Sequence, residues 1–150
     1  MSAIAISRYV DAPPDRVWEV LTDIARSPEV IRAIDAVEVH TGSGFDVGTR
    51  WTETRTMMGR TVSETMEVTG LESGRSYVVE ANSRGTHYRS EFDVAPDNEG
   101  TMLTMSFAGE PSGIGGKIMV ATLGRLFAGQ TRKALAADLE DIARASERRA

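Results

Sequence analysis

The sequence predicts an α+β domain in which one curved antiparallel sheet is covered on one side by helices. Three observations predict it. A strand-like segment is followed at once by two short helical segments, and a two-residue period of apolar side chains then persists from about residue 36 to residue 109. A helical period returns after residue 113 and continues almost to residue 150. The expected order is one strand, two short helices, six strands and one long helix.

The first strand and the helices after it are indicated by residues 4–34. Ile4 and Ile6 alternate with small or polar residues, which predicts a strand that ends near Asp11. The double proline that follows suits the first turn of a helix. One face of that helix carries apolar residues at i, i+4 and i+7, which are Val17, Leu21 and Ile24. The motif SPEVIRAI begins a second short helix, again with proline in its first turn.

Six further strands are indicated between residues 36 and 109 by alternating segments that Gly, Asn and Asp turn signals separate. The segments are AVEVHTG, two strands within GTRWTETRTMMGRTVSETMEVTG, then RSYVVEANS, THYRSEFDVAP and TMLTMSFAG. Short turns make consecutive strands antiparallel. In the last two segments, Tyr88 and Phe92 share one face with Val94, and Phe107 belongs to an apolar set with Leu103 and Met105. His87 then faces solvent.

The long C-terminal helix is predicted from apolar residues at helical spacing between Ile114 and Ile142. Its charged tail, EDIARASERRA, is expected to fray. Gly124 and Gly129 lower its helix propensity by roughly 1 kcal/mol each. Two explanations are open for these glycines: they let the sheet approach closely, which we favour, or they make room for a bound molecule.

Composition limits the functional classes. The chain has 150 residues, 41% hydrophobic and 26% charged, so we expect a single domain over residues 1–150. A net charge of −5 argues against nucleic acid as a partner. With no cysteine, and with His40 and His87 outside any metal-binding spacing, we expect no metal and no cofactor. No signal peptide or membrane-spanning run is evident, so we expect a cytoplasmic protein without stable membrane insertion.

The hairpin formed by residues 50–69 predicts a charged patch inside the fold. With Gly59 and Arg60 as a two-residue turn, Arg55 lies directly opposite Glu64. One face is mostly apolar and carries Trp51, Glu53, Arg55, Met57, Val62, Glu64, Met66 and Val68. The other is entirely polar and carries Thr52, Thr54, Thr56, Ser63, Thr65 and Glu67. The first face should therefore point inward.

Three inward charges need an explanation, because burying an unpaired charge is costly. The first interpretation is a structural ion pair between Arg55 and Glu64, with Glu53 also near Arg55. The second is a polar handle that orients a ligand. The third is an acid or base with a shifted pKa. A one-residue error in register would instead place these charges in solvent.

The whole chain resembles the START-like superfamily, which includes birch-pollen-allergen-type, lipid-transfer and polyketide cyclase/dehydrase-like proteins. The residues that carry the resemblance are DAPPDRVWEVLTD (11–23), VGTRWTE (47–53), MEVTGLESGRSYVVE (66–80) and the long C-terminal helix. The resemblance implies the helix-grip fold, in which a seven-stranded curved antiparallel sheet wraps around the C-terminal helix. It also implies a cavity between the two.

We expect this cavity to bind a small hydrophobic or amphipathic molecule, which is the predicted partner of the protein. We expect the protein itself to be a monomer or a homodimer. Apolar contacts are assigned to Trp51, Met66, Phe92, Phe107, Leu123 and Phe127, and orienting contacts to Glu53, Arg55, Glu64 and Tyr88. The alternative implied by the resemblance is a cyclase/dehydrase-like enzyme with Glu53 or Glu64 as general base. A second alternative is a co-chaperone-like interaction module, which requires an exposed apolar patch.

Overall fold

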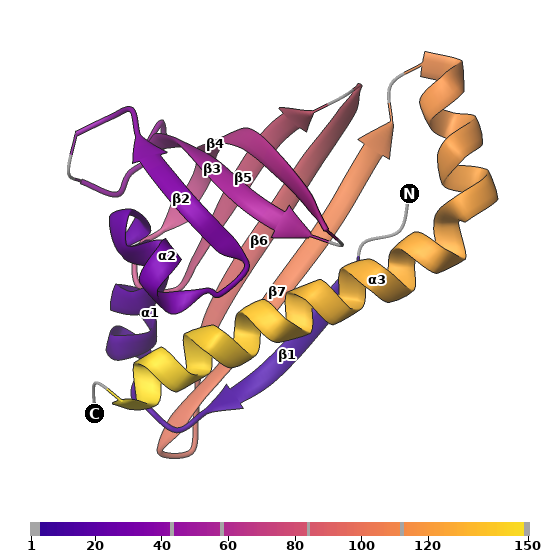
Figure 1. Ribbon diagram of the computed structural model, residues 1–150. Helices are drawn as coiled ribbons and strands as arrows, with labels where there is room; N and C mark the ends of the chain where they lie inside the picture. Colours follow the sequence, from indigo (N-terminus) through magenta and orange to yellow (C-terminus); the bar gives the residue numbers. More distant parts are fainter. Residues whose placement is uncertain (1–3, 43, 58, 84, 112, 149–150) are drawn as a thin grey trace.

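The structure of the protein is a computed structural model, shown in Figure 1. It describes the chain apart from residues 1–3, 43, 58, 84, 112 and 149–150. At residues 57, 111 and 113–128 it describes the backbone alone.

The predicted order of elements is confirmed, and so is the helix-grip arrangement. The elements are β1 (Ile4–Val10), α1 (Pro14–Thr22), a 3₁₀ turn (Ile24–Arg26), α2 (Ser27–Val30), β2 (Ile34–Val39), β3 (Arg50–Met57), β4 (Arg60–Glu72), β5 (Ser76–Ser83), β6 (Thr86–Asp97), β7 (Gly100–Pro111) and α3 (Gly113–Arg148). The second short helix is a single turn that continues directly from the 3₁₀ turn.

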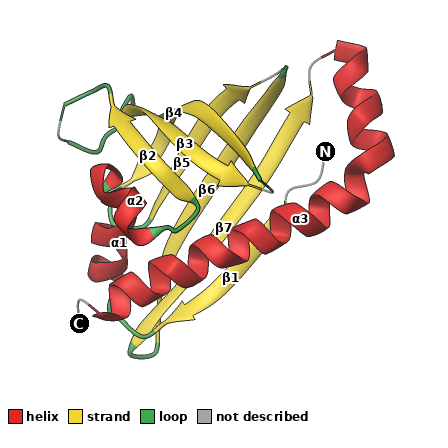
Figure 2. Ribbon diagram, in the orientation of Figure 1, coloured by secondary structure: helices red, strands yellow, loops and turns green. Residues whose placement is uncertain are grey.

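One antiparallel sheet contains the seven described strands in the order β1-β7-β6-β5-β4-β3-β2. Consecutive strands from β2 to β7 pair with one another, and β1 pairs with β7, so that β1 and β2 are the edge strands. Figure 2 shows the three helices gathered on one side of this sheet, with α1 and α2 at one end. The C-terminal part of α3 runs across the sheet, whereas its N-terminal part bends away near the end of β7 (Figure 1).

The pairing predicted for the β3–β4 hairpin is wrong by two residues. Arg55 lies opposite Val62, and Glu53 lies opposite Glu64. The turn comes one residue earlier than expected, with Gly59 at a φ of 76°, a conformation that glycine adopts without steric cost. A shift of two residues preserves the two faces of a strand. The expected division into an inner and an outer face is therefore confirmed.

Hydroxyl groups cover the outer face of the hairpin, and they bond to one another across the strands. Thr52 pairs with Thr65 at 2.9 Å, Thr54 with Ser63 at 2.7 Å, and Thr56 with Thr61 at 3.3 Å. His87 also lies on the outer face, where its ring nitrogens contact Glu80 and Asn82 at 2.7 Å. Because these polar side chains occupy the outer face, the core packs on the opposite face of the sheet.

The tail of α3 does not fray as expected. The helix continues to Arg148, and Ile142, Ala143 and Ala145 are buried near its end. These residues belong to the same core cluster as Val17 and Leu21 of α1. Burial of this apolar face stabilises a helical end that its charges alone would not hold.

The packing role favoured for the glycines of α3 is not supported at Gly129. A Cβ built there would meet no atom within 4 Å, so no neighbouring element approaches closely. Gly124 lies among the residues whose side chains the structure does not describe. None of the described helices has an apolar stretch long enough to span a bilayer.

Candidate ligand-binding site

Along β1, β6 and β7, the inner face of the sheet changes from closely packed to partly uncovered. On β7, Leu103 is fully buried and Met105 is 7% exposed, but Phe107, further along, is only half-buried. On β1, Val10 is fully buried, while Ile6 and Ile4 towards the N-terminus are half-buried. The strands are paired, with Ile4 opposite Phe107 and Ile6 opposite Met105, so the partly uncovered residues lie together.

Strand β6 repeats this gradient. Val94 is 1% exposed, whereas Phe92, Ser90 and Tyr88 become half-buried towards the other end. The partly uncovered region of β1, β6 and β7 will be called the open half of the inner face, defined by Ile4, Ile6, Tyr88, Ser90, Phe92 and Phe107. The closed half is covered by α1 and the C-terminal part of α3, whose Val17 and Leu139 are at most 1% exposed. The open half lies towards the end of the sheet where α3 bends away (Figure 1).

Two aromatic rings form the floor of the open half. Tyr88 and Phe107 stack with ring centroids 5.5 Å apart and an angle of 23° between the planes. They come from neighbouring strands, since Tyr88 lies opposite Gly109 and Phe107 opposite Ser90. Flat stacked rings present a broad apolar surface with a hydroxyl group at one edge.

An aromatic cluster borders this floor. Tyr77 stacks on Phe92 with ring centroids 4.9 Å apart, and it makes T-shaped contacts with Phe45 and Trp18 at centroid distances of 4.9 and 5.8 Å. Phe45 comes from the loop between β2 and β3, and Trp18 comes from α1, so the cluster joins loop, helix and sheet. Burial raises the pKa of the Tyr77 hydroxyl, and the nearby charge of Glu53 raises it further, so this group stays neutral. Tyr77 was not predicted as a site residue, although it begins the inward alternation of β5.

Of the three inward charges of the hairpin, Arg55 contacts both Glu53 on its own strand and Asp138 on α3. Arg55 Nη1 donates to Asp138 Oδ2 over 2.8 Å, and Arg55 Nε donates to Glu53 Oε2 over 3.2 Å. The side chains of Arg55, Glu53 and Asp138 are 19%, 12% and 7% exposed. We call these three residues the ion triad. The expected approach of Glu53 to Arg55 is confirmed, but the second partner of Arg55 is Asp138, and Arg55 lies opposite Val62 rather than Glu64.

The electrostatics of the ion triad are unbalanced, with one guanidinium between two carboxylates. Burial raises the pKa of the Asp138 carboxyl, and the attraction of Arg55 offsets this only in part. For Arg55, desolvation by burial lowers the pKa, but the two carboxylates outweigh it and leave the pKa above its ordinary value. Asp138 therefore holds a proton more readily than an ordinary aspartate does.

Sequence reasoning missed Asp138, although a signal was present. It lies between Leu135 and Ile142, on the apolar stripe of α3. A carboxylate on the buried stripe of an amphipathic helix requires a cation or a proton. Arg55 was the inward cation already identified on the sheet.

Further carboxylates hold the C-terminal part of α3 to the sheet and loops. Glu140 accepts from Arg8 Nε on β1 over 2.7 Å, and Asp141 accepts from the backbone and side chain of Arg32. Glu147 accepts from the backbone N–H of Asp11 over 3.0 Å. With Asp138, these acids anchor one half of α3 at several points.

The remaining predicted residues divide into those that line the inner face and those outside the described side chains. Trp51 is 4% exposed and Met66 is half-buried, and the two lie opposite each other on β3 and β4. Glu64 is half-buried on the same face. Leu123 and Phe127 belong to the part of α3 whose side chains are not described, so their predicted contacts stay predictions.

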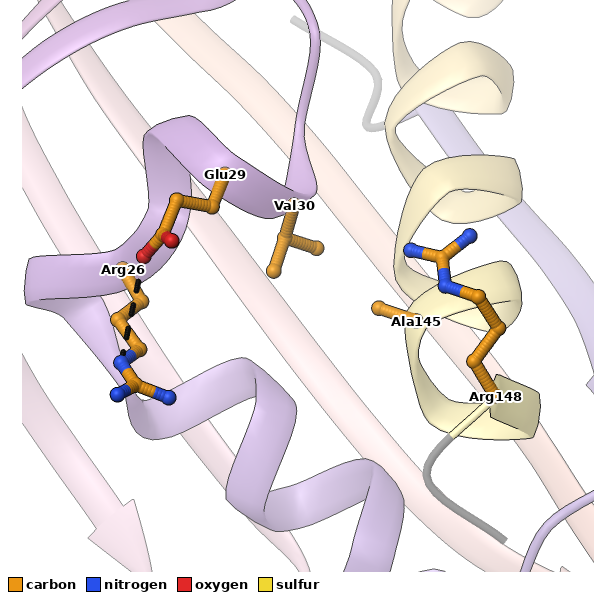
Figure 3. A pocket seen from close by; sticks show the side chains of 5 residues that line it. All are labelled: Arg26, Glu29, Val30, Ala145 and Arg148. Atoms are coloured by element: carbon orange, nitrogen blue, oxygen red, sulfur yellow. Dashed lines mark ion pairs between the residues drawn. The ribbon is translucent and has the colours of Figure 1, made fainter.

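A separate small pocket lies at the far end of α3. It has a volume of about 170 Å³ and is lined by Arg26, Glu29, Val30, Ala145 and Arg148 (Figure 3). None of the predicted ligand-binding residues lines it, and Arg26 and Glu29 are mostly exposed. We therefore place the candidate site on the inner face.

Among the described residues, no group of three or more His, Asp or Glu side chains is placed to hold a metal ion.

The family described as polyketide cyclase / dehydrase and lipid transport matches residues 1–147. The protein belongs to this family. No curated protein matches its sequence. The resemblance to START-like proteins inferred from residues 11–23, 47–53 and 66–80 is thus confirmed. Family and fold together support either a protein that binds hydrophobic ligands or a cyclase-like enzyme.

Solved structures share the fold of this family member at low sequence identity. TTHA0849 from Thermus thermophilus matches with a TM-score of 0.80 and 18% identity over 97% of both chains. Norcoclaurine synthase from Thalictrum flavum, a point mutant in complex with a transition-state analogue, has a TM-score of 0.75 and 17% identity over 97% of this chain and 93% of that one. The di-domain aromatase/cyclase StfQ, from the steffimycin biosynthetic pathway, has a TM-score of 0.74 and 14% identity over 98% of this chain and 51% of its own.

Proposed function

We propose that the protein binds a small hydrophobic or amphipathic molecule between the inner face of the sheet and α3. The observation that carries this proposal is the gradient of burial along β1, β6 and β7. Leu103 and Val94 are buried as in any core, whereas Phe107, Phe92 and Tyr88 on the same face keep accessible surface. The guest contacts the open half, and its polar end lies towards the ion triad.

The energetics favour a guest on this surface. Each square ångström of apolar surface removed from water contributes roughly 25 cal/mol. The stacked rings of Tyr88 and Phe107 offer a flat apolar surface, and the hydroxyl of Tyr88 and the ion triad supply polar contacts. A mostly apolar pocket with a few placed polar groups is the usual composition of a small-molecule site.

The proposal is tested with a neutral fluorescent probe, N-phenyl-1-naphthylamine, and its displacement by decanol. Two neighbouring substitutions on β7 form a matched pair, since Phe107 lies on the inner face and Ser106 on the outer face. Phe107→Gln should weaken probe binding by about tenfold or more, because it removes a ring from the site and adds a polar group. Ser106→Gln should leave it unchanged.

Two results would overturn the proposal. One is the absence of probe binding to a well-folded protein. The other is an equal loss for Phe107→Gln and Ser106→Gln, which would place the probe elsewhere. Native mass spectrometry of the freshly purified protein adds a direct observation, because a retained guest appears as a discrete mass increment.

A cyclase/dehydrase-like enzyme is the second candidate, and the ion triad is the observation that favours it. Burial raises the pKa of Asp138, so this carboxyl holds a proton more readily than an ordinary aspartate, as a group that gives or takes a proton requires. The proton-transfer role first assigned to Glu53 or Glu64 then extends to Asp138. Loss of turnover in Asp138→Asn, with decanol binding retained, would favour the enzyme.

The interaction module, which requires an exposed apolar patch, is not supported. The large apolar residues exposed in the described chain are Tyr9 and Val47, and they lie in different segments.

A further inference from the structure

We propose that the polar end of the guest is a cation, such as an ammonium group, and that Glu53 and Asp138 select it over an anion. This inference rests on the proposed function and adds the chemical class of the guest. Arg55 alone would have indicated an anionic guest. Its partners in the structure reverse that expectation.

The first step concerns the availability of cations on the inner face. Arg8 and Arg55 are its described half-buried arginines, and carboxylates hold both. Arg8 binds Glu140 at 2.7 Å, and Arg55 binds Glu53 and Asp138 at 3.2 and 2.8 Å. A carboxylate guest that approached Arg55 would meet two acceptors of like charge at the same guanidinium. The carboxylate of the guest would gain little from Arg55, because Glu53 and Asp138 would both repel it.

The second step concerns the charge that remains. Glu53 and Asp138 carry two potential negative charges against the single positive charge of Arg55. Their side chains are 12% and 7% exposed, so water compensates the excess poorly. Burial raises the pKa of the Asp138 carboxyl, and the neighbouring charge of Glu53 raises it further. An ammonium group beside the two carboxylates would balance the triad.

The third step places this charge in the proposed site. Glu53 lies on the face that also carries Trp51 and Met66, and Trp51 pairs directly with Met66 across the hairpin. On the next strands, Glu67 pairs with Glu80, and Ala81, the neighbour of Glu80, lies opposite Tyr88 of the open half. The triad is therefore connected with the apolar floor along the sheet, through Met66, Ala81 and Tyr88. An apolar chain on the floor can carry its charged end towards Glu53.

The experiment compares three probes with the same apolar chain: decylammonium, decanol and decanoate. Each displaces N-phenyl-1-naphthylamine from the native protein at neutral pH and low salt, below its aggregation concentration. We expect decylammonium to bind about tenfold or more tightly than decanoate, with decanol between them, because one unit charge acts at short range in a poorly screened site. Equal affinities, or tighter binding of decanoate, would overturn the inference.

Two variants assign the selectivity to the triad. Glu53→Gln and Asp138→Asn should each reduce the ratio of the decanoate and decylammonium dissociation constants several-fold. Asp93→Asn is the matched control, because it removes the same charge from the outer face of β6, where Asp93 pairs with Arg75. An unchanged ratio in Glu53→Gln would overturn the inference. Glu53→Gln keeps the Arg55–Asp138 bond, so the ratio measured in this variant tests the inference if Asp138→Asn does not fold.

The outcomes separate this inference from the proposed function. If decanol and both charged probes fail to displace the fluorophore, the proposed function fails. If decanol binds at the Phe107-dependent site and the two charged probes bind equally well, the proposed function stands and the inference alone fails.

Discussion

Arg55 of β3 and Asp138 of α3, 83 positions apart in sequence, are joined by a hydrogen bond of 2.8 Å between Nη1 and Oδ2. This bond holds the C-terminal part of α3 against the hairpin, and the second bond of Arg55, to Glu53, fixes the guanidinium. Near this bond, hydrogen bonds of Glu140, Asp141 and Glu147 also hold the C-terminal part of α3 to the rest of the fold. The open half lies further along the sheet.

The first prediction concerns this bond. Arg55→Met should lower the free energy of unfolding by about 3 kcal/mol, because it leaves buried carboxylates without their cation. This loss of unfolding free energy is at the low end of the range expected when a buried ion pair is broken, because the side chain of Arg55 is 19% exposed. In the double variant Arg55→Met/Asp138→Leu, the loss should be smaller than in Arg55→Met alone. Urea denaturation measures Arg55→Met, Asp138→Leu and the double variant, and a double variant that loses the sum of the two single effects would speak against the coupling.

The second prediction concerns pH. Hydrogen bonds from Arg8 and then from Arg144 lower the pKa of Glu140 from an ordinary value of 4.5 to about 2. A carboxyl with a lowered pKa stabilises the fold above its unfolded-state pKa and loses this contribution as the pH falls through its folded-state pKa. The difference in unfolding free energy between the native protein and Glu140→Gln should therefore be constant above pH 4.5 and shrink towards about pH 2.

Carboxyl NMR provides the direct check of this pKa. Glu140 should titrate close to pH 2 in the native protein and closer to 4.5 in Arg8→Gln. Titration of Glu140 near 4.5 in the native protein would show that the bond to Arg8 is not made in solution.

The sequence predicted the order of elements, the seven strands and the inward face of the hairpin, because each depends on local periodicity. Its error in the β3–β4 register was a shift of two residues, and periodicity cannot detect such a shift because it leaves both faces unchanged. The partners of Arg55 were missed for a related reason. Asp138 reaches it only through the packing of α3 on the sheet, which no local pattern specifies.

The third prediction concerns a glycine at a close backbone approach. Gly100, the first residue of β7, is buried, and a Cβ there would meet the carbonyl oxygen of Val10 and the hydroxyl of Tyr9. A backbone atom of a paired strand cannot move aside, so Gly100→Ala should cost about 2 kcal/mol of stability. Gly42→Ala is the control, since a Cβ there meets nothing within 4 Å. Thermal unfolding measures both, and equal effects would contradict the prediction.

The fourth prediction concerns the glycine of α3 that no neighbour approaches. Gly129→Ala should raise the free energy of unfolding by about 0.5–1 kcal/mol, because alanine loses less backbone entropy in a helix. Ala137→Gly, at an exposed position of the same helix, is the mirror control and should lower it by a similar amount. A destabilised Gly129→Ala would indicate that the residue has a packing role after all.

The central claim is that a guest lies on the inner face of the sheet, and methionine methyl NMR tests it most directly. Met66 and Met105 are on the inner face, and Met102, on the same strand as Met105, is on the outer face opposite Tyr9. During titration with decanol, the methyl signals of Met66 and Met105 should shift in proportion to the bound fraction while that of Met102 stays in place. Saturable binding that shifts Met102, or that leaves Met66 and Met105 unmoved, would contradict the claim.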